Sequence, residues 1–381
     1  MSTKKKTSIK ILLVILVIVV AFIAGISGEI ITKLYLSKIS FLRDLYFTDL
    51  SNLGQKDIII QEAKTVVVEQ DLRVEQLKNS LQPVVVGIYK AKKQSQNSLD
   101  NVYLPADYLG QAMVLTSDGW LITTSNVASS KTNLVAVPFN KKIYPIEDLI
   151  IDQATDIVFL KIKAQNLPII NFEDSDNLLN GQQVLVYNIF SDRIQAANIL
   201  EKRYQAINNK YDYLNSSEAL NRLILLDQSF AANYQAAPVF DFNGQIVGVL
   251  VNRDKQFNQV IPIQFISPII NQVLKGEQIS RPYLGINYLN IASTYGLSEE
   301  TRQNQEKGAL ILADLKGVAI KADSPLKDKL QSGDIILQIE DQVIDQDQCL
   351  ADILLEYKSG QQLNLKYLRD NQTQDLIFTL K

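Results

Sequence analysis

The longest apolar run of the chain lies near its start. Residues 11–28 carry no charge, and about 18 apolar residues suffice for a helix to cross the hydrocarbon core of a membrane. A lysine cluster precedes the run, at positions 4, 5, 6 and 10, and the positive-inside rule assigns such a cluster to the cytoplasm. The pattern predicts a cytoplasmic tail over residues 1–10, a single-pass transmembrane anchor over 11–28 and an extracytoplasmic body after Glu29.

A cleaved signal peptide is the alternative interpretation of this run. The small residues between Ala21 and Gly28 would suit a cleavage site, but the run is long for a signal core and contains no Ala-x-Ala sequence. An uncleaved anchor in the cell membrane is therefore favoured.

Residues 29–80 are predicted as a stalk and lead-in. Apolar and charged residues alternate in a loosely helical pattern over 30–53, short strands are expected at 58–60 and 66–68, and a helix is expected over 72–81. For 30–53 a plain spacer is favoured over a membrane-surface helix or an oligomer contact.

Short apolar runs bounded by turn residues follow over residues 81–275. Two of them meet at Asp118-Gly119 and two at Asn243-Gly244, dipeptides that favour tight hairpins with positive φ at both turn centres. The spacing predicts a mainly β structure closed into a double barrel. Residues 195–220 are polar and rich in tyrosine and are expected to form loops. Residues 261–274 are expected to form a closing helix, and 276–280 a linker.

Composition excludes several kinds of chemistry. The chain has 381 residues, room for two or three domains, and a net charge of −3 that gives no sign of nucleic-acid binding. It contains no histidine, which excludes a Ser-His-Asp or Cys-His catalytic site, a histidine zinc site and a histidine pH switch. We expect no metal and no cofactor. The single cysteine, Cys349, cannot form an internal disulfide and is expected to be a small buried residue.

Several ordered segments between Leu81 and Lys381 resemble the HtrA (Deg) family, in which a trypsin-like serine protease domain is followed by a PDZ domain. Residues 110–128 are similar, almost position for position, to the family segment Gly-Ser-Gly-x-Ile-x-x-x-Asp-Gly-Tyr-Ile-Leu-Thr-Asn-Asn-His-Val, which places Asn126 where the catalytic histidine stands. Residues 151–162 resemble the segment that supplies the triad aspartate, here Asp156. Residues 82–89 and 172–187 continue the likeness.

The loop before the Asn243-Gly244 hairpin resembles the family sequence Asn-x-Gly-Asn-Ser-Gly-Gly-Pro-Leu. Its last two positions are Pro238 and Val239, but Gln235 stands at the nucleophile and Ala236 and Ala237 replace the glycines that follow. A glutamine is a poor nucleophile and an asparagine has no useful basicity. The resemblance therefore implies a catalytically degenerate member, a pseudoprotease with no catalytic residues.

A different nucleophile is the alternative. Ser229 or Ser125 with a lysine base would make a serine-type endopeptidase of unrecognised chemistry, since Ser-Lys sites exist on other folds. Nothing in the spacing pairs a particular lysine with either serine. Pro238 and the hairpin fix the register too tightly for Ser229, six positions upstream, to replace Gln235.

Residues 281–381 resemble the PDZ domain that follows HtrA protease domains. Tyr283, Leu284, Gly285 and Ile286 match the carboxylate-binding loop and the start of the first pairing strand, and residues 308–311 match the next strand. Gly333-Asp334 is expected to form a turn, after which Ile335, Leu337 and Ile339 alternate as a half-buried strand. A PDZ domain receives a peptide as an added β-strand whose carboxylate binds loop amides. A closed or unused groove is the alternative.

The resemblance implies a membrane-anchored protein that binds unfolded or C-terminal segments of envelope proteins, as a chaperone or adaptor in protein quality control. Family members commonly assemble as trimers through the protease domain, so we also expect a homotrimer or a mixed trimer in which the chain regulates active homologues. No nucleic acid is expected as a partner.

Overall fold

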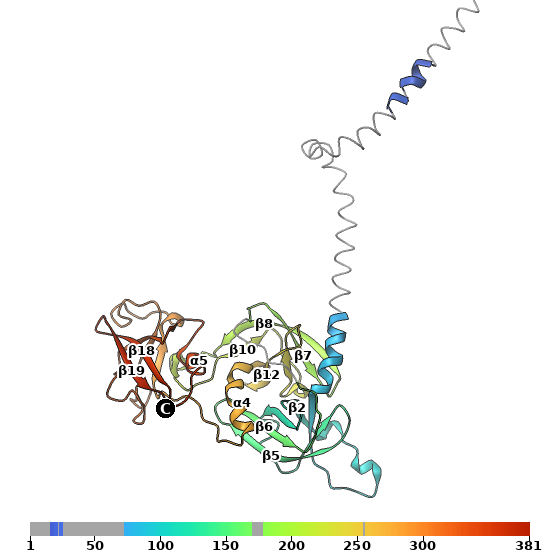
Figure 1. Cartoon of the computed structure of the whole chain (residues 1–381), viewed down its shortest axis with the longest axis horizontal. Coiled ribbons are helices and arrows are strands. Elements are labelled where there is room, and N and C mark those ends of the chain that lie inside the picture. Colours follow the sequence, from blue (N-terminus) through green and yellow to red (C-terminus); the bar gives the residue numbers. More distant parts are fainter. Residues whose placement is uncertain (1–15, 22, 26–71, 170–177, 254–255) are drawn as a thin grey trace, which may run out of the picture. The chain divides into compact units, whose positions relative to one another are not determined.

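The structure is a computed structural model that describes residues 16–21, 23–25, 72–169, 178–253 and 256–381 (Figure 1). The chain divides into two compact units, residues 1–72 and 73–381. In the first unit, residues 16–21 and 23–25 are assigned to helix, and apolar side chains such as Leu16 and Ile23 are 62% and 59% exposed. Across the described ranges no helix is both long and apolar enough to span a membrane. Half of the predicted anchor, the segment 30–53 and the strands at 58–60 and 66–68 lie outside the described residues.

The predicted helix over 72–81 is present and leads into the second unit. Leu77 and Leu81 are buried in the main hydrophobic core, whereas Lys78 forms a 2.7 Å ion pair with Asp192. The helix thus has one apolar face toward the core and one charged face toward solvent.

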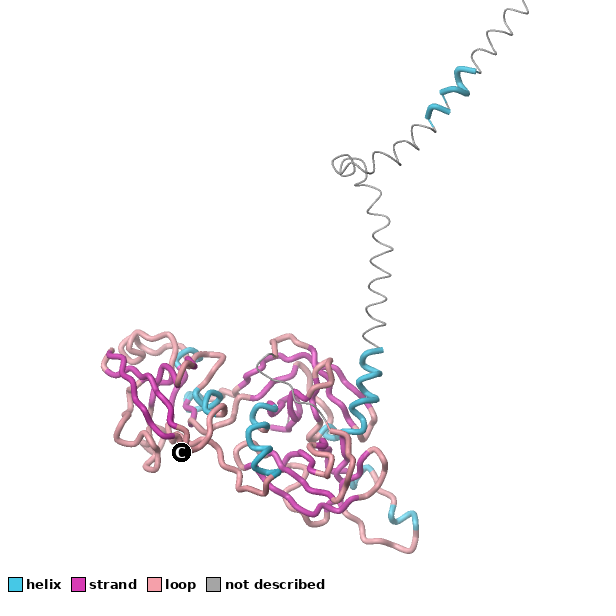
Figure 2. Tube along the Cα trace, in the orientation of Figure 1, coloured by secondary structure: helices cyan, strands magenta, loops and turns pink. Residues whose placement is uncertain are grey.

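The first β-barrel begins directly after this helix. Its strands close in the order β1-β2-β3-β6-β5-β4, all antiparallel. Figure 2 draws these strands, like all others, in magenta. Ile157, Val158, Phe159 and Leu160 are all fully buried, and because successive side chains of a strand point to opposite faces, both faces of β6 are covered. The elements are η2 (Gln82–Val84), β1 (Val85–Lys90), η3 (Ser98–Asn101), η4 (Pro105–Asp107), β2 (Tyr108–Val114), β3 (Trp120–Thr124), β4 (Leu134–Pro138), β5 (Tyr144–Asp152) and β6 (Ile157–Ile162).

The second barrel closes in the order β10-β13-β12-β11-β7-β8 and confirms the predicted double barrel. The expectation of loops over 195–220 was wrong for half of the segment, which is strand: residues 195–204 belong to β8, which pairs along its length with β7 and β10, and residues 214–216 form β9. The expected closing helix is shorter than predicted, since β13 runs on to Pro262. The elements are β7 (Gln183–Asn188), β8 (Arg193–Tyr204), η6 (Lys210–Tyr213), β9 (Leu214–Ser216), β10 (Leu223–Leu226), η7 (Ala232–Tyr234), β11 (Pro238–Phe240), β12 (Ile246–Arg253), β13 (Gln256–Pro262), η8 (Ile263–Phe265) and α4 (Ser267–Leu274).

The two predicted hairpins form, but with a different turn geometry. At each turn only the glycine has positive φ, 105° at Gly119 and 81° at Gly244. At the second turn the carboxylate of Asp241 accepts hydrogen bonds from the backbone N–H groups of Asn243 and Gln245. The Asp241 side chain thus stabilises the turn, and the flanking strands β11 and β12 contain a bulge. In this geometry Asn243 does not need a positive φ.

Gln111 connects the two barrels close to the segments that resemble the catalytic motifs of the HtrA family. Its side chain is fully buried; Nε2 donates to the carbonyl of Tyr187 over 3.2 Å, and Oε1 accepts from the N–H of Ile189 over 2.9 Å. Its backbone N–H donates to the carbonyl of Gln235 over 3.0 Å. Each of these buried polar groups has a hydrogen-bond partner, which offsets the cost of removing the group from water. The contact therefore fixes the two barrels against each other.

The C-terminal part of the second unit is a smaller β domain with one helix. Its sheet has the order β19-β18-β16-β15-β14-β9, with β17 paired to β16. The predicted turn at Gly333-Asp334 is present, and Arg369 holds the Asp334 carboxylate with both Nε and a terminal nitrogen. The elements are β14 (Asn287–Asn290), η9 (Ile291–Ser293), β15 (Ala309–Ile311), β16 (Ile335–Ile339), β17 (Gln342–Val343), α5 (Leu350–Leu354), β18 (Gln362–Arg369) and β19 (Gln372–Thr379).

The expected alternation along β16 is incomplete. Ile335 and Ile336 are both fully buried, although they point to opposite faces of the sheet. Ile336 and Ile339 belong to the main core of this domain, whereas Ile335 belongs to a small second cluster with Leu310 and Leu368. Both faces of the sheet are therefore covered at this point, which a single-strand pattern does not reveal.

Candidate functional site

Asn126 and Asp156 lie on two neighbouring turns of the first barrel. Asn126 follows β3, Asp156 precedes β6, and both are exposed. The turns are joined by the backbone, since the N–H of Ser125 donates to the carbonyl of Asp156 over 2.9 Å. Asp156 has a φ of 63°, a left-handed conformation that aspartate tolerates. The two predicted triad positions are thus adjacent, and neither is enclosed.

The buried aspartate of this region is Asp152, which sequence reasoning did not select. Asp152 is 3% exposed. It accepts hydrogen bonds from the hydroxyl of Thr155 and from two guanidinium nitrogens of Arg281, at 3.2 and 2.6 Å. Arg281 also donates to the carbonyl of Phe265 over 2.8 Å. Asp152 therefore fixes the start of the C-terminal domain to the first barrel, which is a structural role.

Gln235 lies inside the protein, facing the turn that carries Asn126. Its side chain is 7% exposed, and Nε2 donates to the hydroxyl of Thr124 over 3.3 Å. A neutral amide group can donate and accept hydrogen bonds, but it neither attacks a carbonyl nor takes up a proton near neutral pH. The predicted base and nucleophile positions thus hold two neutral amides, Asn126 and Gln235, and the third position holds the carboxylate of Asp156.

The backbone before Gln235 is wound into the one-turn helix η7. The N–H of Gln235 donates to the carbonyl of Ala232 over 3.2 Å, and the N–H of Tyr234 donates to Ala231 over 2.9 Å. Acyl transfer needs free amides aimed at the developing oxyanion, and the amide of Gln235 already has an acceptor. Tyr234 is buried beside Phe230, with ring centroids 5.2 Å apart, and burial raises the pKa of its hydroxyl.

In the part of the chain that the structure describes, the two alternative nucleophiles, Ser229 and Ser125, have no hydrogen bond to a lysine that could act as a base. Ser229 is exposed and Ser125 is half-buried. Among residues 72–169, 178–253 and 256–381, no hydrogen bond joins the hydroxyl of either serine to a lysine. The same ranges contain no group of acidic and cysteine side chains that could hold a metal ion. Cys349 is buried, as expected, and burial raises the pKa of its thiol to about 11.

The second place of interest is the loop of Tyr283, Leu284, Gly285 and Ile286 before β14. Gly285 has a φ of 71°, and the backbone N–H groups of Leu284 and Gly285 converge on one carboxylate oxygen, at 3.1 and 2.7 Å. The hydroxyl of Ser324 donates to the carbonyl of Leu284 over 2.6 Å and fixes the loop from the other side. Successive N–H groups of this kind form a concave anion site. The loop has the geometry of a carboxylate receptor.

The carboxylate in this loop belongs to Glu218, another residue that sequence reasoning missed. Burial alone would raise its pKa, but hydrogen bonds from Ser217, the amide of Gly285 and Ser216, together with the ammonium of Lys321 at 3.0 Å, lower it below the usual value. Glu218 is therefore ionised at neutral pH. No local signal in the sequence marks this glutamate, because the loop amides that it binds, those of Leu284 and Gly285, lie 66 and 67 residues away.

Comparison with known families identifies both folded parts. Residues 110–249 match the family described as trypsin-like peptidase domain, and residues 282–380 match the PDZ domain family. Two curated relatives are each called a probable periplasmic serine endoprotease DegP-like. The one from Marinomonas sp. (strain MWYL1) is 27% identical over 72% of this chain, and the one from Pseudomonas putida (strain W619) is 25% identical over 72%. The chain spans 57% and 56% of these relatives' own lengths.

Solved structures agree with this assignment of the fold. Two described as HtrA-type protease AlgW, one with a decapeptide and one with a tripeptide, superpose with TM-scores of 0.57 at 19% identity. The superpositions cover 80% and 81% of this chain, and 97% and 96% of the two solved chains. The trypsin-like double barrel followed by a PDZ domain is thereby confirmed as the fold.

Proposed function

We propose that this chain, which combines the trypsin-like domain and the PDZ domain of the HtrA/DegP family, binds segments of other proteins without cutting peptide bonds. The observation that carries the proposal is the chemistry around Gln235. Its side chain is a buried amide bonded to Thr124, its backbone N–H is bonded to Ala232, and the chain has no histidine. Nucleophile, base and one oxyanion donor are missing together.

Binding is assigned to the PDZ loop of Tyr283, Leu284, Gly285 and Ile286. The convergent amides of this loop suit a C-terminal carboxylate, and the neighbouring strand β14 suits an added peptide strand. In this proposal the ligands are unfolded or C-terminal segments of envelope proteins, which the chain holds as a chaperone or adaptor in protein quality control.

The proposal also includes a location and an assembly. The relatives are named periplasmic, which fits an extracytoplasmic body, and the uncharged run over 11–28 would anchor that body in the cell membrane. We further propose assembly through the trypsin-like domain, as a homotrimer or as a mixed trimer in which the chain regulates active homologues. A serine-type endopeptidase with Ser229 or Ser125 as nucleophile is the competing function.

The binding proposal predicts that the purified chain binds members of a library of C-terminal peptides with micromolar dissociation constants, measured by fluorescence polarisation. Gly285→Ala is expected to weaken binding at least tenfold, because the added Cβ would lie 2.9 Å from the Tyr283 hydroxyl at a φ of 71°. Gly317→Ala is the matched control: its φ of 79° is similar, and nothing lies within 4 Å of the added Cβ.

Casein added to the same samples tests the competing function. Intact casein beside peptide binding that Gly285→Ala weakens is the expected result. Binding that both glycine variants leave unchanged would show that the loop is not the site. Casein cleavage that persists through purification and is abolished by Ser229→Ala or Ser125→Ala would establish the endopeptidase instead.

A further inference from the structure

A segment of the trypsin-like part already lies on the strand that a peptide would use. β9 pairs antiparallel with β14, with Leu214 opposite Leu289, Asn215 opposite Tyr288 and Ser216 opposite Asn287. β9 is an edge strand of the sheet, and its partner β14 has β15 on the other side. The groove edge of β14 is therefore occupied by the chain itself.

The contacts continue past the strand into the carboxylate loop. The N–H of Ser217 donates to the carbonyl of Ile286 over 2.9 Å, and the hydroxyl of Ser217 accepts from the N–H of Ile286 over 2.9 Å. One residue later, the Glu218 side chain takes the amides of Leu284 and Gly285. Ser217 is 2% exposed, so water does not compete for these bonds.

This set of bonds is the one that a free peptide end would make. An added strand pairs with β14, its last residue donates its N–H to the neighbouring carbonyl, and its terminal carboxylate takes the loop amides. Here Leu214 to Ser216 supply the strand, Ser217 supplies the last N–H, and the side chain of Glu218 supplies the carboxylate.

We propose that residues 214–218 are an internal ligand of the PDZ groove, which a protein with a free C-terminal carboxylate must displace in order to bind. This proposal rests on the proposed function, because the internal ligand would regulate the peptide binding proposed above. The groove alternates between a state closed by Glu218 and a state open to a C-terminal peptide, and only the open state binds. The apparent dissociation constant is then the intrinsic one divided by the open fraction.

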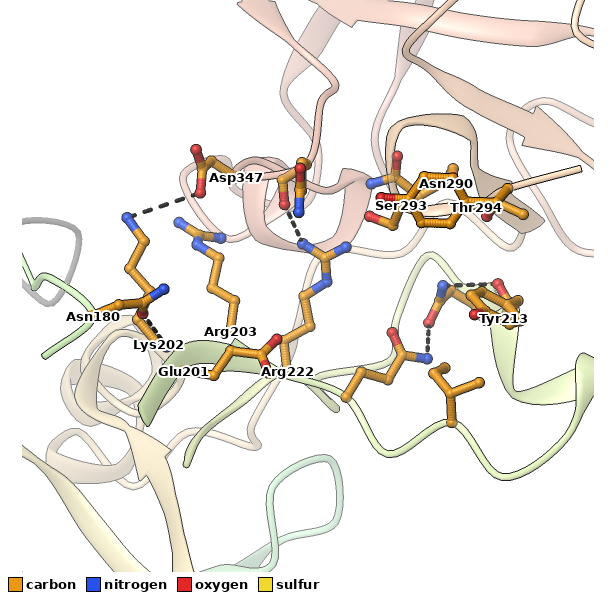
Figure 3. A pocket seen from close by; sticks show the side chains of 15 residues that line it. Asn180, Glu201, Lys202, Arg203, Tyr213, Arg222, Asn290, Ser293, Thr294 and Asp347 are labelled. Carbon is orange, nitrogen blue, oxygen red and sulfur yellow. Dashed lines mark hydrogen bonds and ion pairs between the residues drawn. The ribbon is translucent and has the colours of Figure 1, made fainter. Parts of the chain in front are cut away.

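Ionic contacts around the groove favour the closed state. Two arginines of the trypsin-like part extend toward the PDZ segment that leads into α5 (Figure 3). Arg203 pairs with Asp352, and Arg222 donates to the carbonyl of Gln346 over 3.0 Å. The side chains of Arg203 and Asp352 are only 15% and 10% exposed, so their attraction is weakly screened.

Two variants of Glu218 test the proposal in the full chain. Glu218→Ala removes the internal carboxylate, and Glu218→Gln keeps the shape and one oxygen while removing the charge. We expect Glu218→Ala to bind C-terminal peptides at least tenfold more tightly than the wild type, and Glu218→Gln to lie between them. Glu277→Ala, which removes an exposed glutamate near the linker, is the control and is expected to match the wild type.

Amide hydrogen exchange measures the same closure without any peptide. In the wild type, the N–H groups of Leu284, Gly285 and Ser217 should be protected, and in Glu218→Ala they should exchange at least tenfold faster, with Glu277→Ala unchanged. Equal exchange rates in all three proteins, or equal peptide affinities in proteins that do bind, would overturn the internal ligand. Faster exchange in Glu218→Ala without peptide binding by any variant would support the internal ligand and refute the proposed function.

Discussion

Replacing Asp152 by alanine is expected to lower the free energy of unfolding by about 3–5 kcal/mol. The carboxylate is 3% exposed and is bonded to the guanidinium of Arg281, whose side chain is 14% exposed. Removing it leaves a buried cation with the carbonyl of Phe265 as its remaining acceptor, and an unpaired buried charge is among the costliest single changes. Urea denaturation followed by circular dichroism measures the loss.

Two further proteins identify the cause. Asp156→Asn changes the exposed aspartate at the other end of the same turn to a residue that also adopts positive φ, and it is expected to change stability by less than about 0.5 kcal/mol. Asp152→Leu combined with Arg281→Met removes both charges and is expected to recover most of the loss. A loss below about 1 kcal/mol in Asp152→Ala would show that the pair does not hold the C-terminal domain to the first barrel.

Gly110→Ala is expected to cost about 3 kcal/mol or more. The added Cβ would lie 2.6 Å from Val127 and 2.8 Å from the carbonyl of Gln235, at a φ of 155°. Overpacking costs about 1–3 kcal/mol, and a strained backbone adds about 1–2 kcal/mol. Because the clash lies against the loop that carries Gln235, this glycine allows the two barrels to approach each other beside Gln235.

Gly181→Ala is the control for backbone strain alone. Its φ of 84° also favours glycine, but nothing lies within 4 Å of the added Cβ, so we expect a loss of about 1 kcal/mol. Thermal unfolding of the two variants beside the wild type separates strain from collision. Equal losses in both would mean that Val127 and the Gln235 loop move aside without cost.

The architecture was accessible from the sequence because its signals are local. Hairpins at Asp118-Gly119 and Asn243-Gly244, and the short apolar runs around them, indicate barrel strands without knowledge of any distant contact. The positions of Asn126 and Gln235 followed from motif register, and the structure brings the two surrounding turns together. Whether these positions are catalytically inactive stays a prediction.

The contacts that sequence reasoning missed all depend on distant partners. Asp152 and Asp156 look alike in the sequence, and only Arg281, 129 residues later, distinguishes the buried one. Residues 214–216 lie in the polar segment that was expected to form loops, but they become strand β9 because β14 offers an edge for pairing. The role of Glu218 becomes visible only in the structure, where its carboxylate accepts hydrogen bonds from the amides of Leu284 and Gly285 in the other domain.

The central claim, a trypsin-like domain without an activated nucleophile, is tested most directly by a serine-directed fluorophosphonate. The probe reacts with any activated serine and needs no knowledge of the substrate. The purified chain is incubated with diisopropyl fluorophosphate beside an active serine protease, and intact masses are recorded. The account predicts an unchanged mass for this chain and a single adduct on the control protease. A stoichiometric adduct on this chain, mapped to Ser125, Ser229 or any other serine, would contradict it.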